Sequence, residues 1–131
     1  MLVADYMSLA FPEGVDLQST HDERIDDVIR FIHSNLQKPL SVETLADQCH
    51  LHPNHFMRYF KNKTGQTPAR YVKMKKMEAA KRYLEDTDLY IGEIMERIGE
   101  TNVSNFSKQF KSLYEFSPRD YRKFFQKSKQ V

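Results

Sequence analysis

Two short stretches of the sequence combine aromatic, polar and basic residues in one shared pattern. Phe56-x3-Phe60-Lys61-x5-Thr67-Pro68-x2-Tyr71 recurs about fifty residues later as Phe106-x3-Phe110-Lys111-x5-Ser117-Pro118-x2-Tyr121. Because side chains four residues apart share one helix face, each phenylalanine pair is expected to point inward. The opposite face then carries the side chains that could do chemistry. They are Asn54, Met57, Arg58 and Lys61 in the first stretch, and Ser104, Ser107, Lys108 and Lys111 in the second.

The outward side chains suit the edges of nucleic-acid bases. Arginine can bind O6 and N7 of guanine with two hydrogen bonds, asparagine suits adenine, and a serine hydroxyl can bind a base or a phosphate. A helix-turn-helix places its second helix in the major groove of DNA. The candidates for base contact are therefore Asn54, Met57 and Arg58 in the first copy and Ser104, Ser107 and Lys108 in the second.

A second group of residues is placed to bind phosphate. Lys61 and Lys111 each follow the second phenylalanine of a pair. Arg70 and Arg119 lie in the first turn of the helices expected to begin at Pro68 and Pro118, where free backbone N–H groups favour an anion. His55 joins this group as a candidate for phosphate contact.

The charge of the chain is concentrated beside the two copies. The net charge of 131 residues is only +2, yet residues 52–82 carry nine Lys or Arg against Glu78 alone, a balance of +8. Residues 101–131 reach +5, whereas residues 83–100 between the copies are at −5 and residues 1–20 at −3. Two separate basic blocks favour two contacts with a phosphate backbone over a set of solvated helix faces.

The elements that must position these residues are predicted to be helices. Few glycines and many Leu, Lys, Glu, Met and Arg in 3.6-residue patterns indicate an all-α chain. A first helix is expected to be capped by Thr20 or Asp22 and to end at Lys38-Pro39. Shorter helices follow from Ser41 and from about Pro53, then a long helix from Thr67-Pro68 to about Glu85. Gly65 is predicted to take a left-handed conformation at a helix end.

The second copy repeats this plan with one difference. Ile91 and Ile94 point inward on a short helix, the chain turns at Gly99, and helices follow from about Asn102 to Tyr114 and from Ser117-Pro118. Leu45-Ala46 aligns with Ile94-Met95 at an offset of 49, but the later helices align at 50. The second turn is therefore predicted to be one residue longer.

Several other classes of function are disfavoured by the sequence. Cys49, His50, His52 and His55 cluster in seven residues, but a structural zinc site needs ligand pairs from separated segments, so no metal is expected. No glycine-rich phosphate loop or framed nucleophile indicates an enzyme, and no cofactor is expected. The single cysteine excludes an internal disulfide, and no apolar run is long enough to cross a bilayer. A cytoplasmic protein is predicted.

The ordered string of residues resembles the AraC/XylS family of transcription regulators over about residues 22–126. The resemblance is carried by Leu45-Ala46 and the first copy, by Ala80-x3-Leu84-x2-Thr87-x3-Ile91-x2-Ile94, and by Phe106-x3-Phe110-Lys111 with Pro118-x2-Tyr121-Arg122. It implies seven helices, forming two helix-turn-helix units bridged by one long helix. Recognition helices near 53–63 and 102–114 are then expected to enter successive major-groove segments of double-stranded DNA.

This sequence departs from the family pattern mainly in the second copy. Met95 stands where a small residue is usual, Glu100 where an aromatic residue is usual, and Glu115 where glycine is usual; Lys76 replaces a common arginine. Glu115 cannot take a left-handed conformation as cheaply as Gly65, so the second unit is expected to be looser or bent differently. We therefore expect the first unit to supply most of the sequence discrimination and the second mostly affinity.

The domain organisation and partners follow from the same resemblance. Residues 1–20 are interpreted as a tail or interdomain linker and 21–131 as the DNA-binding domain, with unit one at about 22–66, the linker helix at 67–86 and unit two at 87–126. The family implies activation more often than repression, contact with RNA polymerase, and a dimer only through an N-terminal sensor domain outside this chain, which by itself is expected to be a monomer. The open alternative is a helical protein-interaction module without DNA binding.

Overall fold

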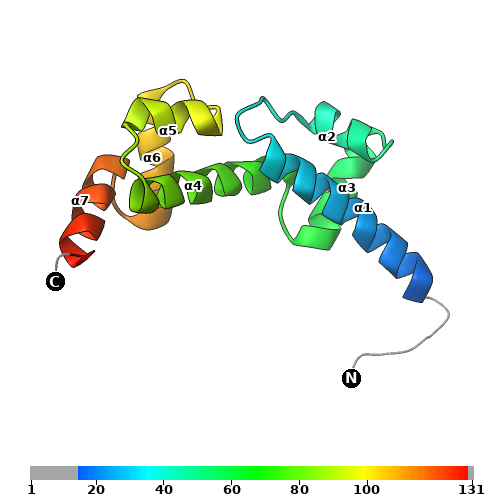
Figure 1. Ribbon diagram of the computed structural model, residues 1–131. Coiled ribbons are helices and arrows are strands. Elements are labelled where there is room, and N and C mark those ends of the chain that lie inside the picture. Colours follow the sequence, from blue (N-terminus) through cyan, green and yellow to red (C-terminus); the bar gives the residue numbers. More distant parts are fainter. Residues whose placement is uncertain (1–14, 130–131) are drawn as a thin grey trace. The chain divides into compact units, whose positions relative to one another are not determined.

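The computed structural model describes residues 15–129 of the chain, with side chains described from residue 23 to 128. Within that range every regular element is a helix, which confirms the predicted all-α fold of seven helices (Figure 1). No helix in the described range is both long and apolar enough to cross a membrane. The helices are α1 Val15–Ser34, α2 Val42–Gln48, α3 Pro53–Thr64, α4 Pro68–Asp86, α5 Ile91–Ile98, α6 Val103–Tyr114 and α7 Pro118–Lys129.

The predicted ends of the first helix are wrong. The expected caps, Thr20 and Asp22, lie inside α1, which begins at Val15, and α1 ends at Ser34, before Lys38-Pro39. Residues 15–22 contain no proline or glycine, so nothing in them stops helix growth toward Gly14. The apolar residues Leu2, Tyr6, Met7, Leu9 and Phe11, interpreted from the sequence as the end of a packed helix, lie outside the described residues.

The chain divides into two compact units that do not follow the sequence order. The first comprises the chain up to Ile32 together with Val42–Pro68, and the second comprises His33–Ser41 together with Ala69 onward. The segment between α1 and α2 therefore packs with the second unit, although both helices that it joins belong to the first.

The first unit has a small core built from one face of each of its three helices. Ile25, Val28 and Ile32 of α1 recur at three- and four-residue spacing and are buried. They share the interior of this unit with residues of α2 and α3, namely Leu45, Ala46, Phe56 and Phe60, all without measurable exposure. The phenylalanines that define the sequence repeat are thus core residues, as predicted.

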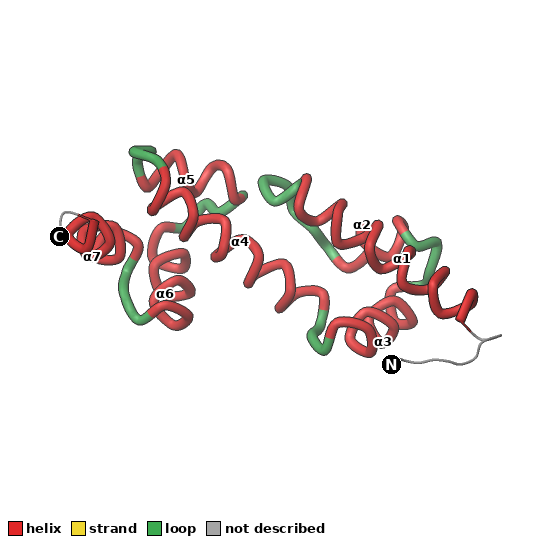
Figure 2. The backbone as a smooth tube through the Cα atoms, turned by 60° about the horizontal axis from the view of Figure 1, so that its bottom comes forward, coloured by secondary structure: helices red, strands yellow, loops and turns green. Residues whose placement is uncertain are grey.

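The second unit gathers three helices around the C-terminal half of α4 (Figure 2). Its core consists of Met77, Ala80 and Leu84 from α4, Ile94, Met95 and Ile98 from α5, and Phe106 and Phe110 from α6. Met95 is accommodated in this core at 8% exposure, although the family usually has a smaller residue there. Phe110 continues into an aromatic cluster with Tyr114 and Tyr121.

Arg122 of α7 closes the end of α4. Its guanidinium donates hydrogen bonds to the backbone oxygens of Leu89 (2.6 Å) and Thr87 (3.1 Å), and longer ones to Leu84 and Tyr83 (3.3 and 3.4 Å). Arg122 thus supplies donors to carbonyl oxygens at and just beyond the end of α4, where Tyr83 O also accepts from Thr87 N (3.1 Å) and Thr87 Oγ1 (2.6 Å). It also places a positive charge at the negative end of the helix dipole. The neighbouring Tyr121 hydroxyl donates to the Glu85 carboxylate, which lowers the pKa of Glu85.

The turns of the two helix-turn-helix units are built alike at an offset of 49 residues. Leu51 N donates to Ala46 O (3.1 Å) just as Glu100 N donates to Met95 O (2.9 Å). His50 (φ 56°) takes the left-handed position that Gly99 (φ 74°) takes in the second turn. The helix caps that follow, His52 and Asn102, are already 50 residues apart. The longer second turn is thus confirmed, and the additional residue lies between Glu100 and Asn102.

The recognition helices end with the same geometry despite different residues. Gly65 (φ 82°) and Glu115 (φ 72°) are both left-handed, and their N–H groups donate to Lys61 O and Lys111 O at 2.8 Å. The expectation that Glu115 would bend the second unit differently at this point is wrong. The glutamate takes the glycine geometry, at a conformational cost of about 1 kcal/mol.

Candidate nucleic-acid interface

Helix α3 presents the predicted polar face to solvent. Phe56 and Phe60 are buried with ring centroids 5.6 Å apart, so the opposite face of the helix points outward. His52 caps the helix, with Nδ1 accepting a hydrogen bond from Asn54 N at 3.2 Å. The predicted site residues of this helix are all exposed, Met57 at 41% of its surface: Asn54, His55, Met57, Arg58 and Lys61.

Helix α6 places most of its predicted residues in the same way. Phe106 and Phe110 are buried, and Asn102 caps the helix by accepting a hydrogen bond from Asn105 N at 2.9 Å. Ser104, Lys108 and Lys111 are exposed, but Ser107 is half-buried. The second helix therefore offers one fewer freely exposed polar side chain than the sequence predicts.

Ser107 lies in a hollow formed by α5, α6 and the start of α7. The hollow has a volume of about 500 Å³, and Arg119, the predicted phosphate ligand of α7, also lines it. The remaining lining residues are Ile91, Gly92, Met95, Val103, Ser117 and Pro118. Of the residues predicted for the second unit, the structure thus brings Ser107 and Arg119 to one place.

Val103 is a residue of this surface that the sequence pattern did not identify. It is the first residue of α6 and lines the hollow, and the residue is 55% exposed to solvent. An apolar residue in a helical pattern is usually interpreted as core. The available signal was its position four residues before Ser107, which puts both on one helix face.

The two predicted phosphate ligands at helix starts both lie at the protein surface. Arg70 and Arg119 are both exposed in the first turns of α4 and α7. In α7, Ser117 Oγ accepts a hydrogen bond from Asp120 N at 3.2 Å, so this backbone donor is already used by the protein. A phosphate at the start of α7 would therefore not meet a free N–H group at Asp120.

A buried lysine anchors the turn that precedes α6. Lys76 of α4 is only 8% exposed, and its Nζ donates hydrogen bonds to Ile98 O (2.7 Å) and Leu36 O (2.8 Å). The lysine, which replaces an arginine common in the family, thus makes two hydrogen bonds to backbone oxygens. Burial lowers the pKa of Lys76, and the charge of Glu100 opposes that change. The negative charge of Glu100 thus acts on Lys76 within the protein.

The histidines next to Cys49 serve the turn and the helix surface. His50 forms the left-handed turn residue, His52 caps α3, and His55 is exposed on that helix. Among the described side chains, no three His, Cys, Asp or Glu residues are grouped in a way that could hold a metal ion. Cys49 is buried, and burial raises the pKa of its thiol.

Comparison with known proteins agrees with this geometry. A family model described as a helix-turn-helix domain matches residues 45–123. The HTH-type transcriptional regulator YobQ of Bacillus subtilis is 34% identical over 72% of this chain and 39% of its own length. The bifunctional transcriptional activator and DNA repair enzyme AdaA of the same organism is 35% identical over 76% of this chain and 47% of its own. The chain thus spans less than half of these relatives.

A solved structure shows the same fold in contact with DNA. The DNA-binding domain of the global transcriptional factor AdpA, crystallised in complex with a target DNA, has a TM-score of 0.77 and 25% identity, covering 80% of this chain and 95% of that domain. Such a DNA-binding domain is not a class of enzyme. With the repeated helix-turn-helix units, their exposed polar faces and the residues matched by the family model, the chain belongs to the AraC/XylS family of helix-turn-helix transcription regulators and carries its DNA-binding domain.

Proposed function

We propose that the chain binds a specific double-stranded DNA sequence by inserting α3 and α6 into two adjacent major-groove segments. The observation that carries this proposal is the pair of exposed helix faces, each opposite a buried phenylalanine pair and each bearing polar and basic side chains. The helix between them in sequence, α4, has 19 residues and so measures roughly 28 Å, close to the ~34 Å height of one DNA turn. One protein molecule then covers both segments.

The side chains divide into two roles. Asn54, Met57 and Arg58 of α3 and Ser104, Ser107 and Lys108 of α6 contact bases, because they project from the first half of each recognition helix. Arg58 is the strongest reader, since a guanidinium can bind guanine with two hydrogen bonds. The remaining residues contact phosphate and fix the position of the protein on the duplex: His55, Lys61, Arg70, Lys111 and Arg119.

The wider role of the protein is transcriptional activation in the cytoplasm, through contact with RNA polymerase. The activator name of AdaA supports this part of the proposal. Residues 21–131 act as the DNA-binding domain and residues 1–20 as a linker. The chain spans less than half the length of these relatives, and effector binding and dimerisation are assigned to a sensor domain outside residues 1–131.

Footprinting and titration at several salt concentrations test the DNA-binding proposal. We expect one protein molecule to protect two major-groove segments about one turn apart. The binding constant should fall steeply with salt, by roughly one power of concentration for each phosphate contacted. Protection of one groove segment only, or a need for two molecules to fill the pair of segments, contradicts the proposed arrangement.

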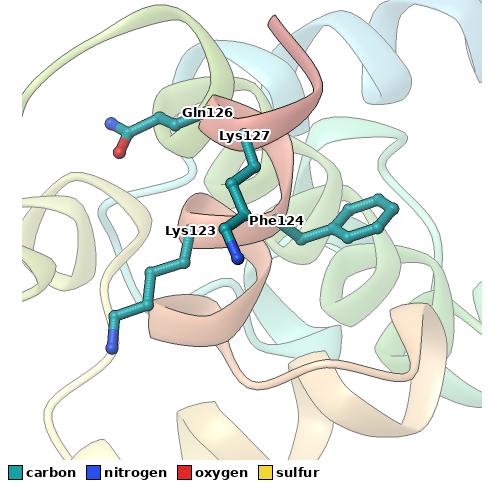
Figure 3. Close-up of a pocket in the computed structure, with 4 residues that line it drawn as sticks. All are labelled: Lys123, Phe124, Gln126 and Lys127. Carbon is teal, nitrogen blue, oxygen red and sulfur yellow. The ribbon is translucent and has the colours of Figure 1, made fainter. Parts of the chain in front are cut away.

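A second candidate function, a protein-interaction module without DNA binding, is favoured by one exposed apolar patch. Phe116 and Phe124 are 37% and 54% exposed, their rings stack at 5.2 Å, and Leu113 is also exposed beside α7. Phe124 borders a hollow of about 440 Å³ together with Lys123, Gln126 and Lys127 (Figure 3). At the equivalent positions fifty residues earlier, the sequence has Lys63, Gln66 and Met74. Binding that is insensitive to salt and abolished by Phe124→Ser would favour this alternative.

A further inference from the structure

The start of α6 carries an exposed apolar side chain at a position where polar readers are expected. Val103 is the first residue of the helix, and more than half of its surface is accessible. Its backbone is fixed because Asn102 caps the first turn through Asn105 N. A β-branched side chain is restricted at χ1, so the two methyl groups of Val103 sample few directions.

The space next to Val103 is open and partly apolar. Ile91 and Met95 of α5 line the same hollow, and Ser107 lies one turn further along α6. Gly92, also in this lining, has no atom within 4 Å of the place where a Cβ would stand. A flat group can therefore approach Val103 from the outside. The protein surface around it combines apolar side chains with the hydroxyls of Ser107 and Ser117 and the guanidinium of Arg119.

Only one group on the base edges of the major groove is apolar, the C5-methyl of thymine. The other base edges present hydrogen-bond donors and acceptors, which a valine would leave unsatisfied at a cost in affinity. We propose that Val103 contacts the C5-methyl of one thymine in the second groove segment and selects an A·T pair there. This inference rests on the proposed function, and it assigns to the second recognition helix one apolar determinant of sequence in addition to Ser104, Ser107 and Lys108.

Deoxyuridine substitution tests the contact at the level of one methyl group. A preferred duplex is first selected with the 131-residue chain, and each thymine of the second segment is then replaced in turn by deoxyuridine, which removes the methyl and keeps the base pair. We expect one position at which the Kd rises about fourfold, the value of one buried methyl group. Val103→Ala should raise the Kd on the unmodified duplex and remove the sensitivity to deoxyuridine at that position.

Two matched variants complete the experiment. Met57→Ala changes an exposed apolar residue of α3 and should leave the sensitivity at the Val103 position intact. Val103→Thr keeps the branched shape and should fold like the parent, as checked by circular dichroism; it should lose part of the preference for thymine over deoxyuridine. A cytosine placed at the same position should bind better when it carries a 5-methyl group.

The failures of the two proposals are distinguishable. A chain that selects no duplex at all overturns the proposed function and this inference with it. A chain that binds DNA, but in which Val103→Ala leaves every deoxyuridine effect unchanged or weakens all sequences equally, overturns the Val103 contact alone.

Discussion

The two helix-turn-helix units share a backbone plan but differ in the residues that achieve it. The first turn uses His50 in a left-handed conformation and the second uses Gly99; the first recognition helix ends at Gly65 and the second at Glu115. In both units the hydrogen bonds that close these turns are the same. The packing of the flanking helices therefore requires a left-handed residue at these positions. Glycine takes this conformation at the lowest energy, but other residues can also adopt it.

The exposed faces of the same units have diverged further than their cores. Each recognition helix buries a phenylalanine pair, yet α3 exposes Asn54, Met57 and Arg58, whereas α6 exposes Val103, Ser104 and Lys108. Core positions must fill a fixed volume, while exposed positions are free to change. The comparison indicates one scaffold used twice, with a different set of exposed side chains in each use.

The largest expected effect is a loss of stability in the second unit, which Lys76 holds together, and not in the first. Lys76→Met keeps the side-chain stem but removes the ammonium that donates to Ile98 O and Leu36 O. We expect a loss of about 2–4 kcal/mol in the free energy of unfolding, because two carbonyl oxygens lose their donor. Hydrogen exchange followed by mass spectrometry should show faster exchange in α5 and α6 than in α2 and α3. Lys76→Arg, which restores donors, should lose less; equal loosening of both units would show that Lys76 does not act on the second unit.

The next comparison concerns the two glycines at left-handed positions. A Cβ on Gly99 would lie 2.8 Å from Gln37 O, whereas a Cβ on Gly65 would meet no atom within 4 Å. Both substitutions to alanine carry the conformational cost of a positive φ, about 1 kcal/mol. Gly99→Ala adds a backbone clash, so we expect it to cost about 2–3 kcal/mol in urea unfolding against about 1 for Gly65→Ala. Similar losses for both variants would mean that the segment near Gln37 moves freely away from the turn.

Much of the fold was predictable because the interior follows simple helical periodicity. Phe56, Phe60, Phe106 and Phe110 recur at four-residue spacing, and the proline or glycine signals at the ends of α3, α4 and α7 mark real boundaries. The start of α1 was not predictable, because Thr20 and Asp22 are polar residues that suit a cap and also the exposed face of a longer helix.

The parts of the site that the sequence did not predict depend on contacts between distant segments. A lysine in a helix is normally exposed, and Lys76 is buried only because residues 36 and 98 bring two carbonyl oxygens to its side chain. Val103 shows the opposite case, an apolar residue that no neighbouring helix covers. Neither environment is encoded in the local pattern, so both needed the structure.

A binding experiment addresses the different chemistry of the two recognition helices. Arg58 and Lys108 are exposed at equivalent positions of α3 and α6. We expect Arg58→Ala to cost about 1–3 kcal/mol on the preferred duplex and to relax the preference at one base pair, because a bidentate contact to guanine is lost. Lys108→Ala should cost about 1 kcal/mol and relax the sequence preference less than Arg58→Ala, because an ammonium group contacts a base as a point charge and not through a two-bond fork. The measurement is base-by-base competition on one duplex, with Lys61→Ala as a control for loss of charge on α3. If Lys108→Ala erases as much sequence preference as Arg58→Ala, the second helix reads DNA as fully as the first.

The smallest expected effect concerns the end of α6, where the left-handed Glu115 should lower the stability of the second unit. Glu115 has a φ of 72°, which strains the backbone of a residue that carries a Cβ. The hydrogen bond from its N–H to Lys111 O is a backbone bond that glycine could make equally well. Glu115→Gly removes the strain but gives the unfolded chain more freedom, so the net gain should be only about 0.5–1 kcal/mol. The reverse change, Gly65→Glu, should destabilise the first unit by a similar amount. Calorimetric melting of both variants checks the pair, and a loss of stability in Glu115→Gly would show that the glutamate side chain makes a favourable interaction that outweighs its backbone strain.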